Sequence, residues 1–278
     1  MNIFLCALCA LGGEEMKLAV TGKGGVGKTT IVAGLARAFV KKGIRVLAID
    51  ADPASSLTQA LGFSPDQRLT PIAEMKDLIA ERTESKPGSM GGFFKLNPRV
   101  DDLPENYFLE KEGIRLMVMG TVQKGGGGCV CPENVLVRTL VSHLLLRKGE
   151  AIILDMEAGV EHLGRATAAA VDQLIVVVEP GRRSLEVAEK IRKLAGDIGL
   201  KNIGLVGNKI RKETDRRFLE EQISELPFIG FLSYDLRIVE ADLAGRAPFE
   251  ENDDFQRVMD EILIRLQALG IEKNSPGN

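Results

Sequence analysis

Residues 17–42 decide the fold, because they read as a buried strand, a glycine loop and a helix in immediate succession. The loop, residues 22–29, has the sequence GKGGVGKT and matches the pattern G-x-x-x-x-G-K followed by Ser or Thr at every fixed position. Its glycines let backbone N–H groups close around phosphate oxygens, and a helix N-terminus favours the same anions. The strand at 17–21 and the apolar spacing of the helix at 29–42 supply the context that the pattern needs. This segment therefore predicts a nucleotide phosphate site.

The side chains of the loop have separate expected roles. Lys28 reaches the β- and γ-phosphates, and the Thr29 hydroxyl can ligate Mg²⁺. Lys23 is a second lysine that a simple P-loop does not need, so it is either a solvated turn residue or an additional catalytic charge. The remaining nucleotide contacts are expected from the loop itself and the start of the helix, which comprise Gly24, Gly25, Val26, Gly27, Lys28, Thr29 and Thr30.

Composition limits the class of protein. The chain has 278 residues and is 45% hydrophobic, which is long enough for one large α/β domain with a substantial core. Its net charge is −3, so no basic surface for nucleic acid or an anionic membrane is expected. We expect a cytoplasmic protein. Four cysteines in two close pairs are typical of metal or redox sites and not of a disulfide framework.

The first fifteen residues stand outside this pattern. Residues 3–11 form an apolar run with Cys6 and Cys9, but the run lacks the basic start of a signal peptide and is too short to span a bilayer. Met16 stands directly before the first strand, so residues 1–15 are most simply explained by a mis-assigned start, with a functional extension as the alternative. The cysteine pair precedes the first strand and so belongs to the edge of the sheet opposite the nucleotide, and we do not count it as a metal site.

The rest of the chain alternates apolar strands with amphipathic helices, which predicts a doubly wound, mostly parallel sheet of the P-loop NTPase fold. Residues 62–113 are polar and contain five prolines, and they are expected to form an insertion of short helices and loops. We expect one ATPase domain over residues 16–270 and a flexible tail at 271–278. The later predicted strands are 45–50, 115–119, 151–155, 173–178, 203–208 and 228–231, and the later predicted helices are 133–147, 184–198, 215–225 and 253–269.

Acidic residues follow two of these strands. Asp50 and Asp52 end the second predicted strand, and Asp155 ends the fourth and is followed by Glu157 and Gly159. Carboxylates at the carboxyl ends of parallel strands face the P-loop, where they can hold Mg²⁺ directly or through water. Aspartate also favours helix N-caps, an alternative that suits Asp52 better than Asp155.

The base is predicted from residues 208–211, with the sequence NKIR. A GTPase needs an aspartate two residues after the lysine to accept from guanine, and Arg211 stands there instead. Asn208 can pair with adenine through its amide. The segment therefore favours ATP.

Cys129 and Cys131 follow four consecutive glycines on the expected nucleotide side of the sheet. In an extended chain the residues of a C-x-C pair point to one face, so both sulfurs can bind one ion. Two thiolates are half of a four-coordinate site, so we expect the same pair of a second subunit to complete it. The alternative is a pair of ordinary reduced cysteines. Soft thiolate ligands suit a transition metal. His162 is a possible further ligand, whereas His143 is expected to be structural.

Three segments together carry a resemblance to a known family. KGGVGK at 23–28, CVCPEN at 129–134 and DMEAGVEHLGR at 155–165 are similar to the CooC-type ATPases, nickel-insertion proteins for carbon monoxide dehydrogenase. These belong to the MinD/ParA/nitrogenase-iron-protein group with a deviant Walker A motif. The similarity extends from Met16 to about Gln267. A close relative that matures acetyl-CoA synthase resembles the chain as well.

The resemblance implies an ATP-linked homodimer that binds nickel or zinc through paired C-x-C motifs, with carbon monoxide dehydrogenase as client. It implies that Lys23 reaches across the dimer to the partner's nucleotide, as an arginine finger does. It also implies that Asp50 approaches the Mg²⁺ shell, Asp52 orients the attacking water, Asp155 is the Walker B acid and Gly159 senses the γ-phosphate.

Other members of the group fit less well. A MinD-like membrane ATPase needs a basic amphipathic C-terminal helix, and residues 269–278 are short and weakly basic. A ParA-like partition protein needs a basic surface for DNA. An iron–sulfur reductase of the group has its two cysteines far apart in sequence. We therefore expect neither a nucleic acid nor a membrane partner.

Overall fold

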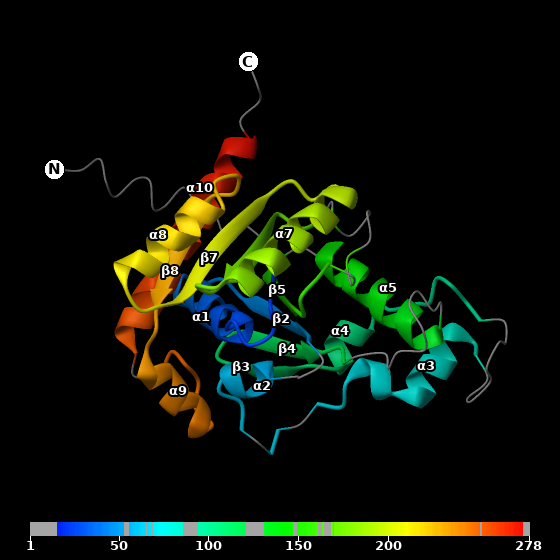
Figure 1. The fold of residues 1–278 in the computed structure, drawn as a ribbon. Helices are drawn as coiled ribbons and strands as arrows, with labels where there is room; N and C mark the ends of the chain where they lie inside the picture. The colour runs from blue at the N-terminus through cyan, green and yellow to red at the C-terminus, as the bar shows by residue number, and fades with distance from the viewer. Residues whose placement is uncertain are drawn as a thin grey trace.

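A computed structural model of the chain describes residues 16–274 apart from 53–55, 65, 68, 86–93, 121–130, 147–148, 161–162, 164–167, 169 and 251. Within this part of the chain one eight-stranded sheet runs through the molecule in the order β3-β4-β2-β5-β1-β6-β7-β8 (Figure 1). All neighbouring strands are parallel except β3 and β4, which are antiparallel. The strands are β1 Lys17–Gly22, β2 Val46–Ala51, β3 Leu109–Lys111, β4 Ile114–Val118, β5 Ala151–Met156, β6 Gln173–Val178, β7 Ile203–Ile210 and β8 Phe228–Ser233.

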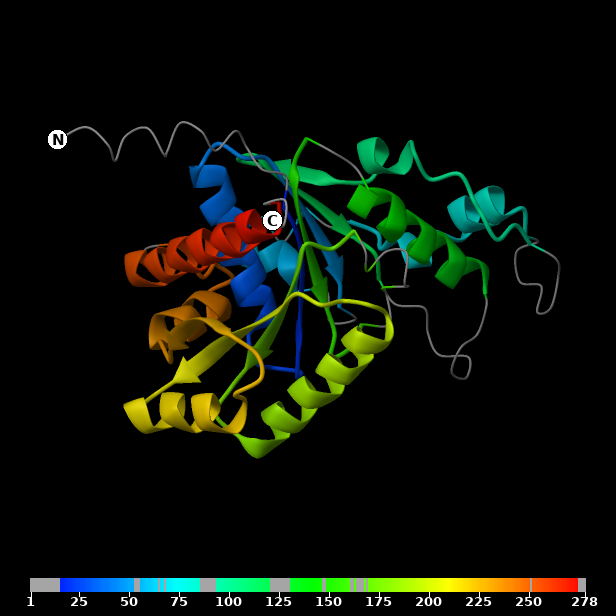
Figure 2. The ribbon, with the colours of Figure 1, turned by 90° about the horizontal axis from the view of Figure 1, so that it is seen from above.

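Helices cover both faces of the sheet, as Figure 2 shows from above. The longer ones are α1 Lys28–Lys41, α5 Pro132–Leu146, α7 Arg182–Asp197, α8 Glu213–Gln222 and α10 Asp253–Asn274. The shorter ones are α2 Leu57–Ala60, the 3₁₀ helix η1 Ile72–Glu74, α3 Lys76–Thr83, α4 Leu103–Asn106 and α9 Leu236–Leu243. The predicted α/β, doubly wound, mostly parallel sheet is confirmed.

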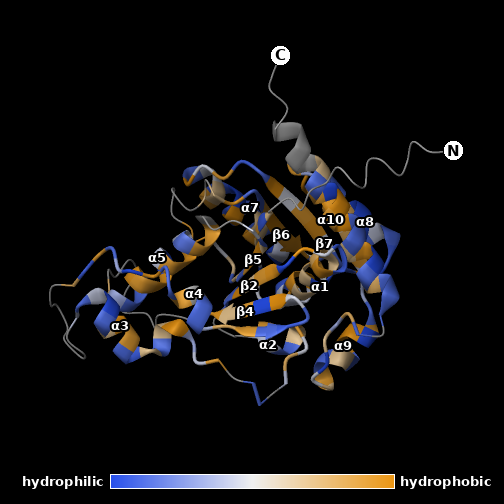
Figure 3. Cartoon of the chain, turned by 180° about the vertical axis from the view of Figure 1, so that it is seen from behind, coloured by the Kyte–Doolittle hydropathy of each residue, from blue (hydrophilic) through white to orange (hydrophobic). Residues whose placement is uncertain are grey.

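The core lies in two apolar layers, one on each face of the sheet. Successive residues of a strand point to opposite faces. In β1, Leu18 and Val20 belong to the cluster with α1 and α10, whereas Ala19 belongs to the cluster with α5 and α7. Figure 3 shows the result as apolar strands in the middle and hydrophilic residues on the outer helices. Because both faces are covered, the central strands are apolar on both faces until they reach their carboxyl ends, which is the signal that made them predictable.

The position of β1 in the sheet determines where the site lies. It pairs with β5 on one side and with β6 on the other, and β5 in turn pairs with β2. The carboxyl ends of these four strands therefore meet at one edge, with the glycine loop at the end of β1. In open α/β sheets ligands bind outside this edge.

The strand β3 and the helix α9 were absent from the prediction. β3 has no apolar run, because Leu109 is half-buried and Glu110 and Lys111 are exposed. α9 is eight residues long and buries only Ala241, so little of it belongs to the core although its apolar residues have helical spacing. Its start does carry a recognisable signal, since the Asp235 carboxylate accepts a hydrogen bond from the Arg237 N–H at 2.9 Å.

The ends of the chain differ from the prediction at one point. α10 continues to Asn274, beyond the predicted helix end at 269 and into the segment 271–278 expected to be a tail. Residues 1–15 lie outside the described part. In the described parts of 62–113 the chain forms the short helices η1, α3 and α4, as predicted, and also the edge strand β3, which the prediction of helices and loops did not include. None of the described helices combines the length and hydropathy needed to cross a bilayer.

The C-terminal helix α10 packs directly on the P-loop helix α1. Gly34 of α1 allows this approach, because a Cβ placed there would lie 2.5 Å from Cγ of Met259 and 2.7 Å from Cζ of Phe255. Both partners are buried, with exposed fractions of 0% and 3%. The glycine therefore sets the distance between the two helices.

Gly34→Val is expected to lower the free energy of unfolding by about 1–3 kcal/mol, because the added methyl groups overpack the contact between α1 and α10. Urea unfolding followed by circular dichroism measures the change. Gly196→Val in α7 is the matched control, since a Cβ there has no heavy atom within 4 Å. It should change stability by less than about 0.5 kcal/mol. Equal stability of the two variants would show that the α1–α10 contact is loosely packed.

Candidate nucleotide-binding site

The glycine loop packs closely against the carboxyl-terminal parts of β6 and β7. A Cβ on Gly22 would lie 2.4 Å from the carbonyl oxygen of Val177 in β6. A Cβ on Gly27 would lie 2.4 Å from Nδ2 of Asn208, and Gly27 also has a left-handed φ of 96° where it caps α1. Both positions therefore require glycine. The loop places Val26 in the interior, leaves Gly24 and Gly25 exposed, and directs the first N–H groups of α1 toward the edge of the sheet.

Two consecutive residues of β7 hold the loop in place. Nδ2 of Asn208 donates to the Val26 carbonyl at 2.7 Å, and Nζ of Lys209 donates to the Gly25 carbonyl at 2.6 Å. Neighbours in a regular strand point to opposite faces, but Lys209 has a φ of 58°, and this left-handed conformation lets both side chains reach the loop. Adenine contact by Asn208 stays a prediction, since its amide in this structure binds the loop.

Two buried aspartates stand beside the loop. Asp50 and Asp155 are directly opposite each other in the β2–β5 register, and both have an exposed fraction of 0%. Oγ1 of Thr29 donates to Oδ2 of Asp155 at 2.7 Å. Burial raises the pKa of Asp155 to about 7; the hydrogen bond from Thr29 and the charge of Lys28 oppose the rise, and the Asp50 carboxylate adds to it.

The second carboxylate oxygen of Asp155 indicates which kind of ligand Asp155, Asp50 and Thr29 can bind together. Oδ1 is buried and has no hydrogen-bond partner among the described residues. A buried oxygen that lacks a partner is costly unless a ligand satisfies it. Carboxylate and hydroxyl oxygens from Asp155, Asp50 and Thr29 form the hard donor set that Mg²⁺ prefers. The residues present therefore fit a magnesium ion beside the phosphates.

Asp52 lies against the phosphate-binding lysine. Its Oδ2 is 3.3 Å from Nζ of Lys28, and the two side chains are 17% and 6% exposed. Asp50 orients this segment, because its carboxylate accepts from the N–H groups of Asp52 and Leu57, both at 3.2 Å. The Ser56 hydroxyl follows and donates to Oγ1 of Thr29 at 3.3 Å. The segment after β2 therefore contacts both side chains that would touch the triphosphate and its metal.

Gly159 lies close to the end of β1. Its N–H donates to Oγ1 of Thr21 at 3.1 Å, and the same hydroxyl donates to the Glu157 carbonyl at 2.6 Å. Thr21 thus connects the strand before the P-loop to the segment after β5. The contact of Gly159 with a γ-phosphate stays a prediction, and it would require this N–H to leave Thr21.

Lys23 is paired within its own chain. Its Nζ donates to Oε1 of Glu179 at 2.8 Å, and Oε2 of Glu179 lies 3.4 Å from Nζ of Lys209. Burial alone would raise the pKa of Glu179, but the two lysines outweigh it and hold that pKa below its ordinary value. Sequence reasoning missed Glu179, Lys209 and Ser56. A usable signal existed for Glu179, the first polar residue after the apolar strand β6.

The metal site expected from the cysteines is only partly described. Cys129 and His162 lie outside the described residues. Cys131 is half-buried one residue before α5, and its carbonyl accepts from the Val135 N–H at 3.0 Å. In the described part of the chain no three His, Cys, Asp or Glu side chains form a metal-binding group. The C-x-C site therefore stays a prediction.

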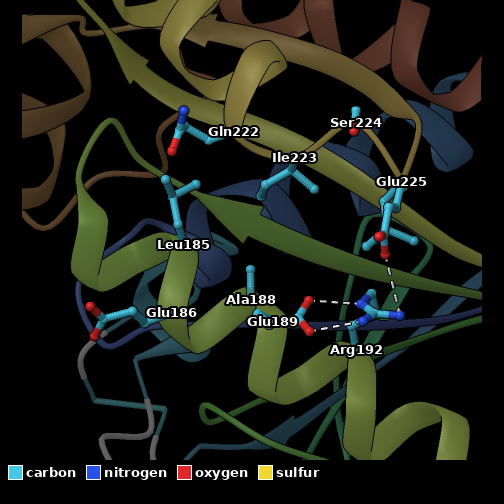
Figure 4. Close-up of a pocket in the computed structure, with 10 residues that line it drawn as sticks. Leu185, Glu186, Ala188, Glu189, Arg192, Gln222, Ile223, Ser224 and Glu225 are labelled. Carbon is cyan, nitrogen blue, oxygen red and sulfur yellow. Dashed lines mark hydrogen bonds and ion pairs between the residues drawn. The ribbon is translucent and has the colours of Figure 1, made fainter.

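A pocket of about 400 Å³ lies away from this chemistry, between α7 and the α8–β8 connection (Figure 4). Ion pairs of Arg192 with Glu189 at 2.7 Å and with Glu225 at 3.5 Å cross one end of it. The floor is apolar and includes Leu185 and Ile223. None of its ten lining residues is a predicted site residue, so we do not assign the nucleotide to it.

Comparison with known proteins agrees with this geometry. The model of the CobQ/CobB/MinD/ParA nucleotide binding domain matches residues 17–249. The carbon monoxide dehydrogenase accessory protein CooC of Rhodospirillum rubrum is 48% identical over 238 residues, which cover 84% of this chain and 90% of that protein. An uncharacterised ATP-binding protein of Methanocaldococcus jannaschii is 46% identical over 234 residues, covering 83% and 90%.

Among solved structures, MinD of Pyrococcus horikoshii with Mg-ADP superposes with a TM-score of 0.66 at 18% identity, covering 95% of this chain and 100% of that one. At this identity the likeness shows the fold alone. The family match and the 48% identity to CooC go further and show the family. The chain is therefore an ATPase of the CobQ/CobB/MinD/ParA nucleotide-binding family and belongs, within it, to the CooC-type deviant Walker A group.

Proposed function

We propose that this protein is a cytoplasmic, ATP-dependent metallochaperone that carries Ni²⁺ for insertion into carbon monoxide dehydrogenase. The observation that carries the proposal is the 48% identity to the accessory protein CooC over 84% of the chain. The site geometry supports the ATPase part, because Lys28 pairs with Asp52 and Thr29 with Asp155 beside the glycine loop. The nickel ion is cargo, and Cys129 and Cys131 are its proposed ligands, shared with a second copy of the chain.

The same contacts indicate how hydrolysis would proceed. Thr29, Asp50 and Asp155 would hold Mg²⁺, which neutralises charge on the phosphates during transfer. The loop N–H groups and Lys28 bind the β- and γ-phosphates. Lys28 now pairs with Asp52, so phosphate binding draws the lysine away and leaves the Asp52 carboxylate to orient the attacking water. A carboxylate in this position can also accept the proton of that water.

Lys23 is the proposed link between hydrolysis and dimerisation. A P-loop already has Lys28 as its phosphate lysine, and Lys23 is 35% exposed at the outer side of the loop. We propose that it stabilises the transition state in a second copy of the chain, as an arginine finger does in trans. ATP would then be hydrolysed only in the dimer, and the dimer would also complete the nickel site.

Lys28→Ala is expected to weaken ATP binding by about 100-fold, because the phosphates lose their charged hydrogen-bond donor. Lys23→Ala should keep the affinity of the monomer for ATP and lower turnover by about 10³-fold, since its proposed role is in trans. Isothermal titration calorimetry and phosphate release measure the two effects. Normal turnover in the Lys23 variant would contradict the role in trans.

Asp52→Asn should keep ATP and Mg²⁺ bound and slow turnover by about 100-fold, because the amide cannot accept the proton of the attacking water. With ATP the variant should therefore accumulate as a dimer. Size-exclusion chromatography with light scattering measures the mass, and phosphate release measures turnover. A variant that stays monomeric with ATP, or that hydrolyses it at the normal rate, would remove Asp52 from this role.

Nickel and ATP should each tighten the binding of the other by the same factor, because both favour the dimer. Equilibrium titration should find one Ni²⁺ per two chains and an affinity that rises with a non-hydrolysable ATP analogue, within the usual range of about 5–150-fold. Cys129→Ser/Cys131→Ser should abolish the effect and keep the nucleotide affinity of the monomer. Cys6→Ser/Cys9→Ser is the matched control and should bind nickel normally. One ion per chain, independent of nucleotide, would show that each subunit completes its own site.

A further inference from the structure

The Glu179 carboxylate holds the side chain of Lys23 beside its own P-loop. The β1–β6 register brings this contact about, since Gly22 pairs with Val177 and the two residues follow directly where the strands end. Nζ of Lys23 lies 2.8 Å from Oε1 of Glu179, and the two side chains are 35% and 23% exposed. An ion pair of this length is a charge-assisted hydrogen bond.

Glu179 is itself held at a defined place. Its N–H donates to Oγ of Ser184 at 3.0 Å, and Ser184 is 2% exposed at the start of α7. Its second carboxylate oxygen lies 3.4 Å from Nζ of Lys209. Lys209 also donates to the Gly25 carbonyl at 2.6 Å. Glu179 therefore connects Lys23, through Lys209, to the Gly25 carbonyl of the same glycine loop.

The position of Lys23 in this network conflicts with the position it needs in a dimer. The Lys23 ammonium group has three donors, but Glu179 holds it beside its own glycine loop, so the side chain must move outward to reach a nucleotide on another chain. Glu179 is ionised at neutral pH, because the two lysines hold its pKa below the ordinary value. The contact with Lys23 must therefore open for any role in trans.

We propose that Glu179 is a positioning residue that retains Lys23 on its own subunit without nucleotide and releases it when a second copy of the chain binds. The release step rests on the proposed function of Lys23 in trans. Retention opposes dimerisation, because the ion pair is lost when the lysine moves. Glu179 thus sets the protein and ATP concentrations at which dimers form and hydrolysis begins.

The first experiment tests retention and needs no dimer. The nucleotide-free protein, dilute enough to be monomeric, is labelled with acetic anhydride, and mass spectrometry measures the rate at Lys23. Glu179→Gln should raise that rate by about two- to fivefold, as expected for a partly exposed ion pair. Glu220→Gln removes a comparable partner, 3.1 Å from Arg216 on α8, and should leave the Lys23 rate unchanged. An unchanged rate in Glu179→Gln would overturn the proposal.

The second experiment tests release. Sedimentation velocity with a non-hydrolysable ATP analogue should give Glu179→Gln a dimer dissociation constant about two- to fivefold lower than that of the wild type. The dimer dissociation constant of Glu179→Asp should lie between those of Glu179→Gln and the wild type. In the Lys23→Ala background Glu179→Gln should leave the dimer dissociation constant unchanged. A lower dissociation constant there would show that Glu179 acts without Lys23 and would overturn the proposal.

The two experiments separate the inference from the proposed function. A wild-type protein that stays monomeric with ATP would overturn the role of Lys23 in trans and, with it, the release step. Faster labelling of Lys23 in Glu179→Gln would in that case still establish retention. A third outcome is that the wild type dimerises normally and that Lys23 is labelled at the same rate in the wild type and in Glu179→Gln. This outcome would leave the proposed function intact and remove Glu179 from its regulation.

Discussion

The parallel pairing of β5 between β1 and β2 is the constraint on which the site depends. It places Asp155 directly opposite Asp50 and brings both to the level of the glycine loop at the end of β1. Since all three strands are buried on both faces, the two carboxylates reach a place from which water is excluded, and one of them keeps an oxygen with no partner among the described residues. The fold thus gathers carboxylate oxygens at the place where a phosphate-bound cation would lie.

The loop carries two lysine–carboxylate pairs that differ in their exposure. The pair of Lys28 and Asp52 lies inside, and the pair of Lys23 and Glu179 lies outside. Anionic phosphate can displace the inner carboxylate because it offers Lys28 more charge. The outer pair faces solvent, where only a ligand that arrives from outside can compete for the lysine. Two similar contacts can therefore respond to two different events, nucleotide binding and the approach of another molecule.

The P-loop, the order of strands and helices, and the acidic strand ends could be predicted from sequence, because each leaves a local pattern of glycines, apolar runs or carboxylates. Elements that bury few residues, such as β3 and α9, could not be predicted from sequence. The hydrogen bonds by which Asn208 and Lys209 hold the glycine loop could not be predicted from local patterns either. They depend on a left-handed φ at a lysine, a residue type that rarely adopts it. The same applies to Glu179, whose contacts come from segments far apart in the chain.

The close contact of Gly34 with Phe255 and Met259 joins the two ends of the described sequence. During synthesis the P-loop helix leaves the ribosome long before α10 exists, and at about 5–20 residues per second the interval is on the order of ten seconds or more. Throughout that time the apolar stripe of α1 that α10 will cover has no partner. The nascent chain should therefore need the help of a chaperone, or a slow rate of association, until its last helix is made.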